Sequence, residues 1–427
     1  MSSIPNINLS EPIVFDLSDK NNMIKLKINE KYEAHFSPKS GLLNQIVSID
    51  NNNDILKAKI SIIQYGTTTA SEKSGAYLFL PDGKATELAS DFTQWIRVET
   101  GLLRIRVCVN MTLLLHCVEF YPTLNQAIDL KYPHFSVWNI VDLRNSHNKE
   151  IALHIDTDIK NGDTLYTDLN GFQFIKRKTL SKLPLQGNVY PMPTASFIQD
   201  ESLRFNLLTA QPLGVASLEQ SAIQVFLDRR LDQDDNRGME QAMNDNILTS
   251  SRFIMFFESI QNTNKYNKQV DHPSLMLQLF SYDLLNPTLK LVLEKNNAEN
   301  YDSALLPNRH FLKKYPCDLR LINLRSMQTP NEEPLPNEVG LILHRIVYDD
   351  CVQHVSQTNN ICNIENKILS FEDLFNFISN KSNNNIDISH TYLTFSEKES
   401  TKIQQKEPII KYVQPMQIEA FRVKFQN

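Results

Sequence analysis

The stretch Leu103-Arg-Ile-Arg-Val-Cys-Val109 places an aliphatic side chain at every second position, with two arginines and a cysteine between them. A β-strand that buries one face requires this period of two. Similar alternation occurs in Met23–Asn29 and Phe421–Phe425. Short apolar runs such as Phe253-Ile-Met-Phe-Phe257 are typical of inner sandwich strands. These patterns predict an all-β protein of packed antiparallel sheets.

Helical periodicity is rare outside residues 369–378, which are the best short helix candidate. At 427 residues the chain exceeds one ordinary core, so we expect two or three domains. Polar stretches at residues 261–268 and 329–336 are rich in Asn, Pro, Glu and Lys, and indicate surface loops or domain edges.

Charge and hydropathy argue against several classes of partner. The net charge of -6 is spread along the chain, whereas a nucleic-acid partner usually requires a basic stripe. No window reaches eighteen consecutive apolar residues, so we expect no membrane segment. The first twenty residues lack the basic and apolar regions of a secretory signal.

The segment from Lys73 to Gly83 reads as a strand closed by a Pro-Asp-Gly turn. Its pattern alone favours an ordinary hairpin arm. The functional alternative is that Tyr77 places its phenol at a sugar site, where the ring offers an apolar face and the hydroxyl a polar group.

A second candidate is Leu227–Gly238, in which three arginines interleave with four aspartates. The guanidinium group presents a fixed fork of donors that matches carboxylates. Arg229 or Arg230 could therefore orient a catalytic carboxylate or a sugar hydroxyl. A loop whose charges neutralise one another is an equally good interpretation.

Residues 166–199 are rich in proline and in polar and aromatic side chains. Asp168, Asn170, Asn188 and Tyr190 could hydrogen-bond to sugar hydroxyls. The favoured interpretation is that they tie down loops.

The run His154-x-Asp156-x-Asp158 would put three potential metal ligands on one face of a strand. The better interpretation is a solvated face, because Leu153 and Ile155 would bury the other side. The five cysteines form no CxxC pair, so a thiolate zinc site is also not expected. We therefore expect no metal site in this chain.

Several of these segments, taken in order, closely resemble the C-terminal region of Golgi-type α-mannosidases of glycoside hydrolase family 38. The resemblance covers roughly residues 22–427 and rests on a series of matches. They are Ser74-Gly-Ala-Tyr-Leu-Phe-Leu-Pro-Asp-Gly83, Tyr166-Thr-Asp-Leu-Asn-Gly-Phe-Gln173, Leu183-Pro-Leu-Gln-Gly-Asn-Val-Tyr-Pro-Met-Pro193, Ala210–Leu218 and Asp228-Arg-Arg-Leu-Asp-Gln-Asp-Asp-Asn-Arg-Gly238.

The resemblance implies stacked antiparallel β-sandwiches, of the galactose-mutarotase-like super-sandwich type, with a smaller terminal β unit. Residues 1–20 match poorly, residues 21–325 would form the large sandwich domain and residues 335–427 the smaller one. The family's N-terminal domain, which holds the zinc and the catalytic nucleophile, has no counterpart in this sequence. The chain alone is therefore expected to be inactive and free of zinc.

The implied activity is that of a retaining α-mannosidase, which removes α-1,3- and α-1,6-linked mannose from N-glycans in the Golgi lumen. Motif alignment places the family's sugar-contacting tyrosine on Tyr77 and its active-site arginine on the Arg229–Arg230 pair. Loop spacing favours Arg230, which we expect to pair with an aspartate on a concave surface shared with Tyr77. The alternatives are a stand-alone carbohydrate-binding or scaffolding module, or a truncated reading of a longer gene.

The resemblance also implies a disulfide. The resembling enzymes have two cysteines at the place of Cys351 and Cys362, and their luminal compartment favours oxidation. We therefore expect a Cys351–Cys362 bridge, with Cys317 as a buried free thiol.

Overall fold

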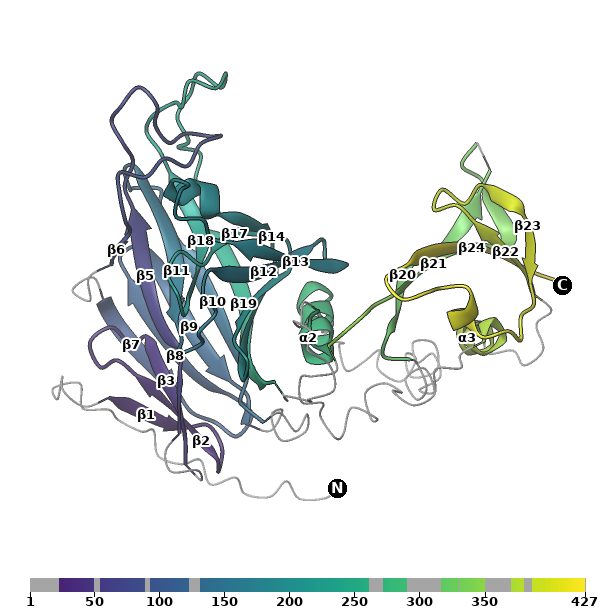
Figure 1. Cartoon of the computed structure of the whole chain (residues 1–427), viewed down its shortest axis with the longest axis horizontal. Helices are drawn as coiled ribbons and strands as arrows, with labels where there is room; N and C mark the ends of the chain where they lie inside the picture. Colours follow the sequence, from purple (N-terminus) through teal and green to yellow (C-terminus); the bar gives the residue numbers. More distant parts are fainter. Residues whose placement is uncertain are drawn as a thin grey trace, which may run out of the picture. The chain divides into compact units, whose positions relative to one another are not determined.

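The computed structural model describes residues 23–49, 54–88, 93–122, 131–260, 272–289, 316–329, 331–349, 370–379 and 386–426. The chain divides into two compact units, residues 1–267 and 268–427 (Figure 1). This division falls before the boundary expected near residue 325, because strand β20 (Leu319–Gln328) pairs within the sheet of the second unit.

The described residues of the first unit form three antiparallel sheets, which confirms the predicted all-β class. The four-stranded sheet has the order β1 (Ile24–Lys27), β2 (Tyr32–Phe36), β3 (Leu43–Ser48) and β4 (Ile55–Lys57). The nine-stranded sheet has the order β13 (Gln173–Lys178), β12 (Thr164–Leu169), β15 (Ala195–Gln199), β16 (Leu203–Thr209), β19 (Thr249–Ser259), β10 (Phe135–Val141), β9 (Leu114–Phe120), β8 (Ile105–Met111) and β7 (Thr93–Glu99). The six-stranded sheet has the order β14 (Tyr190–Met192), β17 (Leu213–Ala216), β18 (Ala222–Arg230), β11 (Lys149–Asp156), β5 (Lys59–Tyr65) and β6 (Thr86–Glu87).

One continuous core joins these three sheets. Phe36 of the four-stranded sheet, Phe205 of the nine-stranded sheet and Ile155 of the six-stranded sheet are all fully buried in it. Burying each such side chain contributes about 1.5–3 kcal/mol. Strand β8 shows how the sequence specifies the packing, because Ile105 and Val107 face this core as their alternation predicts.

A β-bulge interrupts the six-stranded sheet where β18 pairs with β11. Ile151 pairs with Asp228 and Ala152 pairs with Phe226, so Leu227 has no opposite residue on β11. A bulge shifts the alternation of the strand beyond it. As a result Arg229, directly opposite Glu150, projects from the same face of the sheet as Phe226.

The part of the second unit that the structure describes forms one five-stranded antiparallel sheet. Its order is β20, β21 (Pro334–Arg345), β24 (Ile418–Phe425), β22 (Ile386–Thr391) and β23 (Glu397–Ile403). Helix α3 (Phe371–Ser379) confirms the helix expected at residues 369–378 and packs Phe371 against Phe421 of β24, with ring centroids 4.9 Å apart.

Helix α2 (Leu275–Leu285), which the sequence patterns did not predict, begins after Ser274, whose hydroxyl accepts a hydrogen bond from the Leu277 N–H at 3.0 Å. Among the described residues, no helix has the length and apolar character needed to cross a membrane.

The disulfides differ from those expected. Cys108 and Cys117 lie directly opposite each other on β8 and β9 and form a disulfide that the sequence analysis did not anticipate. Cys317 is buried, as expected, but it is disulfide-bonded, so the expectation of a free thiol is wrong. Cys351 and Cys362 lie outside the described residues, and so does the bridge expected between them.

Candidate functional site

Two loops beyond the same end of the six-stranded sheet meet at the predicted site. They follow β5 and β18, and run together at the top of the first unit in Figure 1. The buried carboxylate of Asp235 accepts hydrogen bonds from the backbone N–H groups of Tyr77 and Leu78, at 2.7 and 2.9 Å. Gln233 adds bonds to the Thr67 hydroxyl and the Ser74 carbonyl. The loop that carries Tyr77 is therefore fixed by the loop that follows Arg230.

The contact between the two loops is close enough to require a glycine. A Cβ atom on Gly75 would lie 2.5 Å from the backbone nitrogen of Asp235, so any larger residue would push the loops apart. Burial favours the neutral form of the Asp235 carboxyl, but the hydrogen bonds from Tyr77 and Leu78 outweigh it and lower its pKa. A charged Asp235 thus holds a loop whose tip exposes 64% of Tyr77.

Arg229 holds the same loop from the sheet. One guanidinium nitrogen, Nη2, donates to the Leu78 carbonyl at 2.7 Å and to Glu150 Oε1 at 2.9 Å. Glu150 is only 3% exposed, and this burial raises the pKa of its carboxyl although Arg229 opposes the shift. The ion pair therefore links strands β18 and β11 to the Tyr77 loop.

Arg230, the next residue of β18, projects from the opposite face of the sheet and has different partners. Its Nε donates to the Ser146 carbonyl at 2.9 Å, and its Nη1 donates to the Asn244 carbonyl at 2.8 Å. The aspartate nearest to it is Asp232, with 3.9 Å between Arg230 Nε and the carboxylate oxygen. Two backbone carbonyls thus accept hydrogen bonds from the guanidinium group, and Asp232 is the nearby aspartate partner that we expected.

A pocket of about 630 Å³ opens beside Arg229. Its apolar lining includes Phe79, Leu213 and Phe226, and its polar lining includes Glu150 and Arg229. Asp228 also lines it, and burial raises the pKa of that carboxyl despite hydrogen bonds from Arg229 and Thr249. A few polar groups in an apolar pocket can bind and orient a small polar ligand.

The polar side chains of residues 166–199 tie down loops, which is the interpretation that the sequence favoured. Asp168 is fully buried and accepts hydrogen bonds from the N–H groups of Gly171, Thr194 and Ala195. The Asn188 side chain bonds both the N–H and the carbonyl of Leu180. The Tyr190 hydroxyl donates to the Lys178 carbonyl at 2.7 Å, and Asn170 lies in a turn with a positive φ of 52°.

The His154 cluster does not come together as a metal site. His154 Nε2 lies 3.3 Å from Asp156 Oδ1, but β11 ends at Asp156 and Asp158 is exposed beyond it. Within the described residues, no group of three or more His, Cys, Asp or Glu side chains could hold a metal ion. His154 and Asp156 instead line a second pocket, which the sequence patterns gave no means to foresee.

Comparison with known proteins identifies the class to which this fold and these loops belong. Residues 28–237 match the glycosyl hydrolases family 38 C-terminal domain. This stretch includes the Tyr77 loop, Arg229 and Arg230. The chain therefore belongs to this family of glycosyl hydrolases, and carries its C-terminal domain.

Curated relatives make the similarity more specific. The chain is 38% identical to alpha-mannosidase 2 of Rattus norvegicus over 79% of its own length, and 40% identical to alpha-mannosidase 2 of Homo sapiens over 73%. It spans only 29% and 27% of these two relatives. A solved alpha-mannosidase from Enterococcus faecalis shares the fold, with a TM-score of 0.53 and 9% identity over 93% of this chain and 42% of that one.

Proposed function

We propose that this chain is the C-terminal part of a retaining α-mannosidase that removes α-1,3- and α-1,6-linked mannose from N-glycans in the Golgi lumen. The homology to alpha-mannosidase 2 enzymes over most of the chain supports this activity. The observation that carries the site proposal is the double anchoring of the Tyr77 loop, by Asp235 from one loop and by Arg229 from the sheet.

In this proposal the two loops form one wall of the catalytic cleft. Tyr77 presents its ring and hydroxyl to a mannose residue, and its exposure of 64% leaves it accessible to a ligand. Arg229 is a positioning residue, because it fixes the Leu78 carbonyl next to Tyr77. Arg230 fixes the backbone at Ser146 and Asn244 on the other side of β18. Such preorganisation aids catalysis without direct participation in the chemistry.

The reacting groups would come from the remainder of the enzyme, which is the main partner of this chain. A retaining mechanism requires a nucleophile and an acid/base carboxyl about 5–5.5 Å apart. Zinc would be bound by that N-terminal catalytic domain. The residues described in this chain do not fit such a site, since they offer no cluster of three or more metal-binding side chains, whereas a catalytic zinc needs about three protein ligands.

The test is a chimera in which this chain replaces the matching C-terminal part of human alpha-mannosidase 2. We expect the purified chimera to release mannose from N-glycans and from an aryl α-mannoside, and to lose this activity when zinc is removed. The parent human enzyme is the matched control, and the isolated chain should be inactive.

A folded but inactive chimera would contradict the proposal, as would turnover by the isolated chain. An inactive chimera together with N-glycan binding by the isolated chain would favour the alternative of a carbohydrate-binding or scaffolding module.

A further inference from the structure

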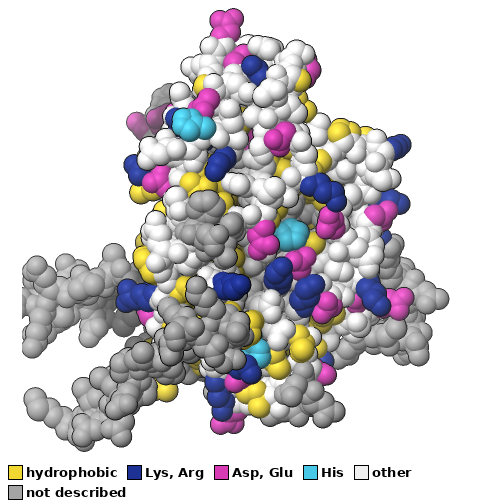
Figure 2. Space-filling view, turned by 90° about the vertical axis from the view of Figure 1, so that its left-hand side faces the viewer, with side chains coloured by type: hydrophobic (Ala, Val, Ile, Leu, Met, Phe, Trp, Pro, Cys, Tyr) yellow, Lys and Arg dark blue, Asp and Glu magenta, His cyan; other side chains and the backbone are white. Residues whose placement is uncertain are grey.

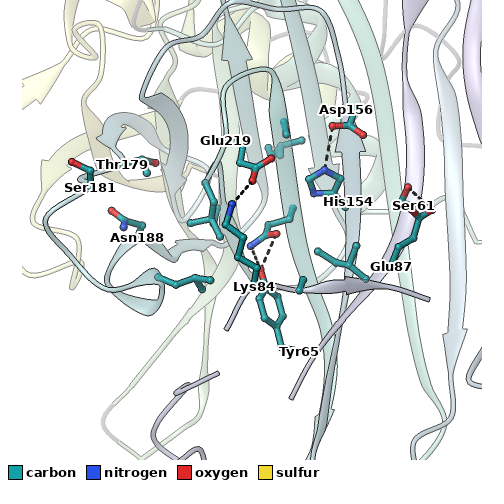
Figure 3. Close-up of a pocket in the computed structure, with 18 of the residues that line it drawn as sticks. Ser61, Tyr65, Lys84, Glu87, His154, Asp156, Thr179, Ser181, Asn188 and Glu219 are labelled. Atoms are coloured by element: carbon teal, nitrogen blue, oxygen red, sulfur yellow. Dashed lines mark hydrogen bonds and ion pairs between the residues drawn. The ribbon is translucent and has the colours of Figure 1, made fainter. Parts of the chain in front are cut away.

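A pocket of about 530 Å³ lies on the exposed face of the six-stranded sheet, over β5, β11 and β18 (Figure 3). Its volume is within the range of roughly 300–1,000 Å³ that small-molecule sites occupy. It is separate from the pocket beside Arg229. The rings of Tyr65, Phe79 and Phe226 pack together between the two, with centroids 5.0–5.8 Å apart.

Strand register places the polar floor of this pocket. Ser61 of β5 and Gln224 of β18 both lie opposite His154 of β11, so the three side chains form one row across the sheet. In the next row Asp156 lies opposite Lys59. The floor therefore offers hydroxyl, amide, imidazole and carboxylate groups, which include both donors and acceptors of hydrogen bonds.

Hydrogen bonds within the protein fix the wall beside this floor. It consists of residues 179–188, which include the short 3₁₀ helix Leu185–Asn188. Asn188 is 4% exposed and bonds to Leu180 at its N–H and its carbonyl. The Thr179 hydroxyl donates to the Ser217 carbonyl at 2.7 Å. A wall fixed in this way lowers the entropy cost of binding.

Most of the charged side chains of the pocket already have partners within it. Lys84 and Glu219 point toward each other, with 3.3 Å between Nζ and Oε1, and His154 faces Asp156 (Figure 3). Glu87 accepts a hydrogen bond from Ser61 at 3.1 Å. Acidic and basic side chains are also intermixed over the face drawn in Figure 2. A charged ligand would have to compete with these pairs, so the pocket favours a neutral polar ligand.

Apolar side chains complete the lining. Leu183 and Leu185 come from the wall, Ile63 comes from β5, and Leu218 comes from the turn before β18. A pyranose ring has the matching chemistry, since its C–H faces are apolar and each rim hydroxyl both donates and accepts hydrogen bonds. We propose that this pocket binds a neutral sugar residue, as a second carbohydrate site distinct from the Tyr77 loop.

The test is saturation-transfer difference NMR on the full chain with the neutral methyl glycosides of mannose, glucose, galactose and N-acetylglucosamine. Methyl glucuronide and glucosamine are the charged comparisons. We expect at least one neutral glycoside to bind and the charged sugars to bind at least tenfold more weakly. If no neutral glycoside binds, or a charged sugar binds best, the proposal is wrong.

Variants assign the binding to the pocket. Glu87→Ala alters an exposed residue on β6, and His154→Ala alters the centre of the floor. We expect each to raise Kd about tenfold with the fold retained by circular dichroism. His147→Ala is the matched control for His154→Ala, because this exposed histidine also has one aspartate partner, Asp232 at 2.7 Å.

Tyr77→Ala separates this proposal from that of the catalytic cleft. Binding that survives Tyr77→Ala and His147→Ala but is lost in the Glu87 and His154 variants supports a second site. Binding that is lost in Tyr77→Ala, or that survives both pocket variants, would overturn it. An inactive chimera would contradict the proposed catalytic function and leave this binding result standing.

Discussion

Arg229 and Asp235 hold one short backbone segment through opposite kinds of hydrogen bond. The guanidinium group of Arg229 donates to the Leu78 carbonyl, and the carboxylate of Asp235 accepts from the Leu78 N–H. Tyr77 lies next to this doubly bonded residue, and its own N–H is also bound by Asp235. The position of an exposed tyrosine is thus set by the half-buried guanidinium of Arg229 and the buried carboxylate of Asp235.

Replacement of Asp235 should measure this anchoring. Asp235→Ala leaves two backbone N–H groups without their acceptor, so we expect the free energy of unfolding to fall by about 1.5–3 kcal/mol. Urea denaturation followed by circular dichroism is the measurement. Asp234→Ala is the control, because Asp234 is less buried and bonds only its neighbour, the Asn236 N–H. Equal effects of the two variants would contradict the anchoring role.

The pH dependence of Asp235→Ala follows from the lowered pKa of Asp235. A carboxyl whose pKa is lower in the folded state stabilises the protein fully above its unfolded pKa of about 3.9. This contribution is lost as the pH falls through the lower, folded value. The difference in stability between wild type and Asp235→Ala should therefore be constant above about pH 5 and shrink below about pH 4.

At the scale of strands and helices, periodicity predicted some features and not others. Alternation at residues 103–109 and 421–425 correctly indicated strands, and the amphipathic segment at 369–378 correctly indicated a helix. Helix α2 was missed because six of its eleven residues are buried, among them Gln278 and Ser281, which leaves a weak polar–apolar contrast.

Loop spacing favoured Arg230, and the bulge at Leu227 explains why it is Arg229 that projects beside Phe226. Consecutive residues of a strand project from opposite faces of the sheet, so only one of Arg229 and Arg230 can face the pocket. A single unpaired residue upstream exchanges their faces. The pocket over His154 had no signal either, because its floor comes from three strands that are far apart in the sequence.

The disulfide on the β8–β9 hairpin gives a prediction at this scale. Cys108 and Cys117 are nine residues apart and close a short loop, so chain entropy predicts a contribution of about 2–3 kcal/mol. We expect the double variant Cys108→Ala/Cys117→Ala to unfold at correspondingly lower urea concentration. Reductant should then destabilise wild type more than the variant. Equal stabilities of the two oxidised proteins would contradict this contribution.

At the scale of the whole molecule, one sheet of the first unit carries both proposed sites. Its end holds the Tyr77 loop and the pocket beside Arg229, and its exposed face holds the pocket over His154. The chain spans only about three tenths of the alpha-mannosidase 2 relatives, which agrees with a division of roles in which this part binds and orients the substrate. In the proposed function, the reacting groups belong to the rest of the enzyme.

The most direct test of this division is the kcat/KM of the chimera for an aryl α-mannoside after Tyr77→Phe. The account predicts a fall of about 2- to 13-fold, because one hydroxyl hydrogen bond contributes about 0.5–1.5 kcal/mol. Tyr392→Phe, at an exposed tyrosine of the second unit, should leave kcat/KM unchanged. An unchanged kcat/KM in Tyr77→Phe, or an equal fall in both variants, would contradict the claim that the Tyr77 loop forms a wall of the catalytic cleft.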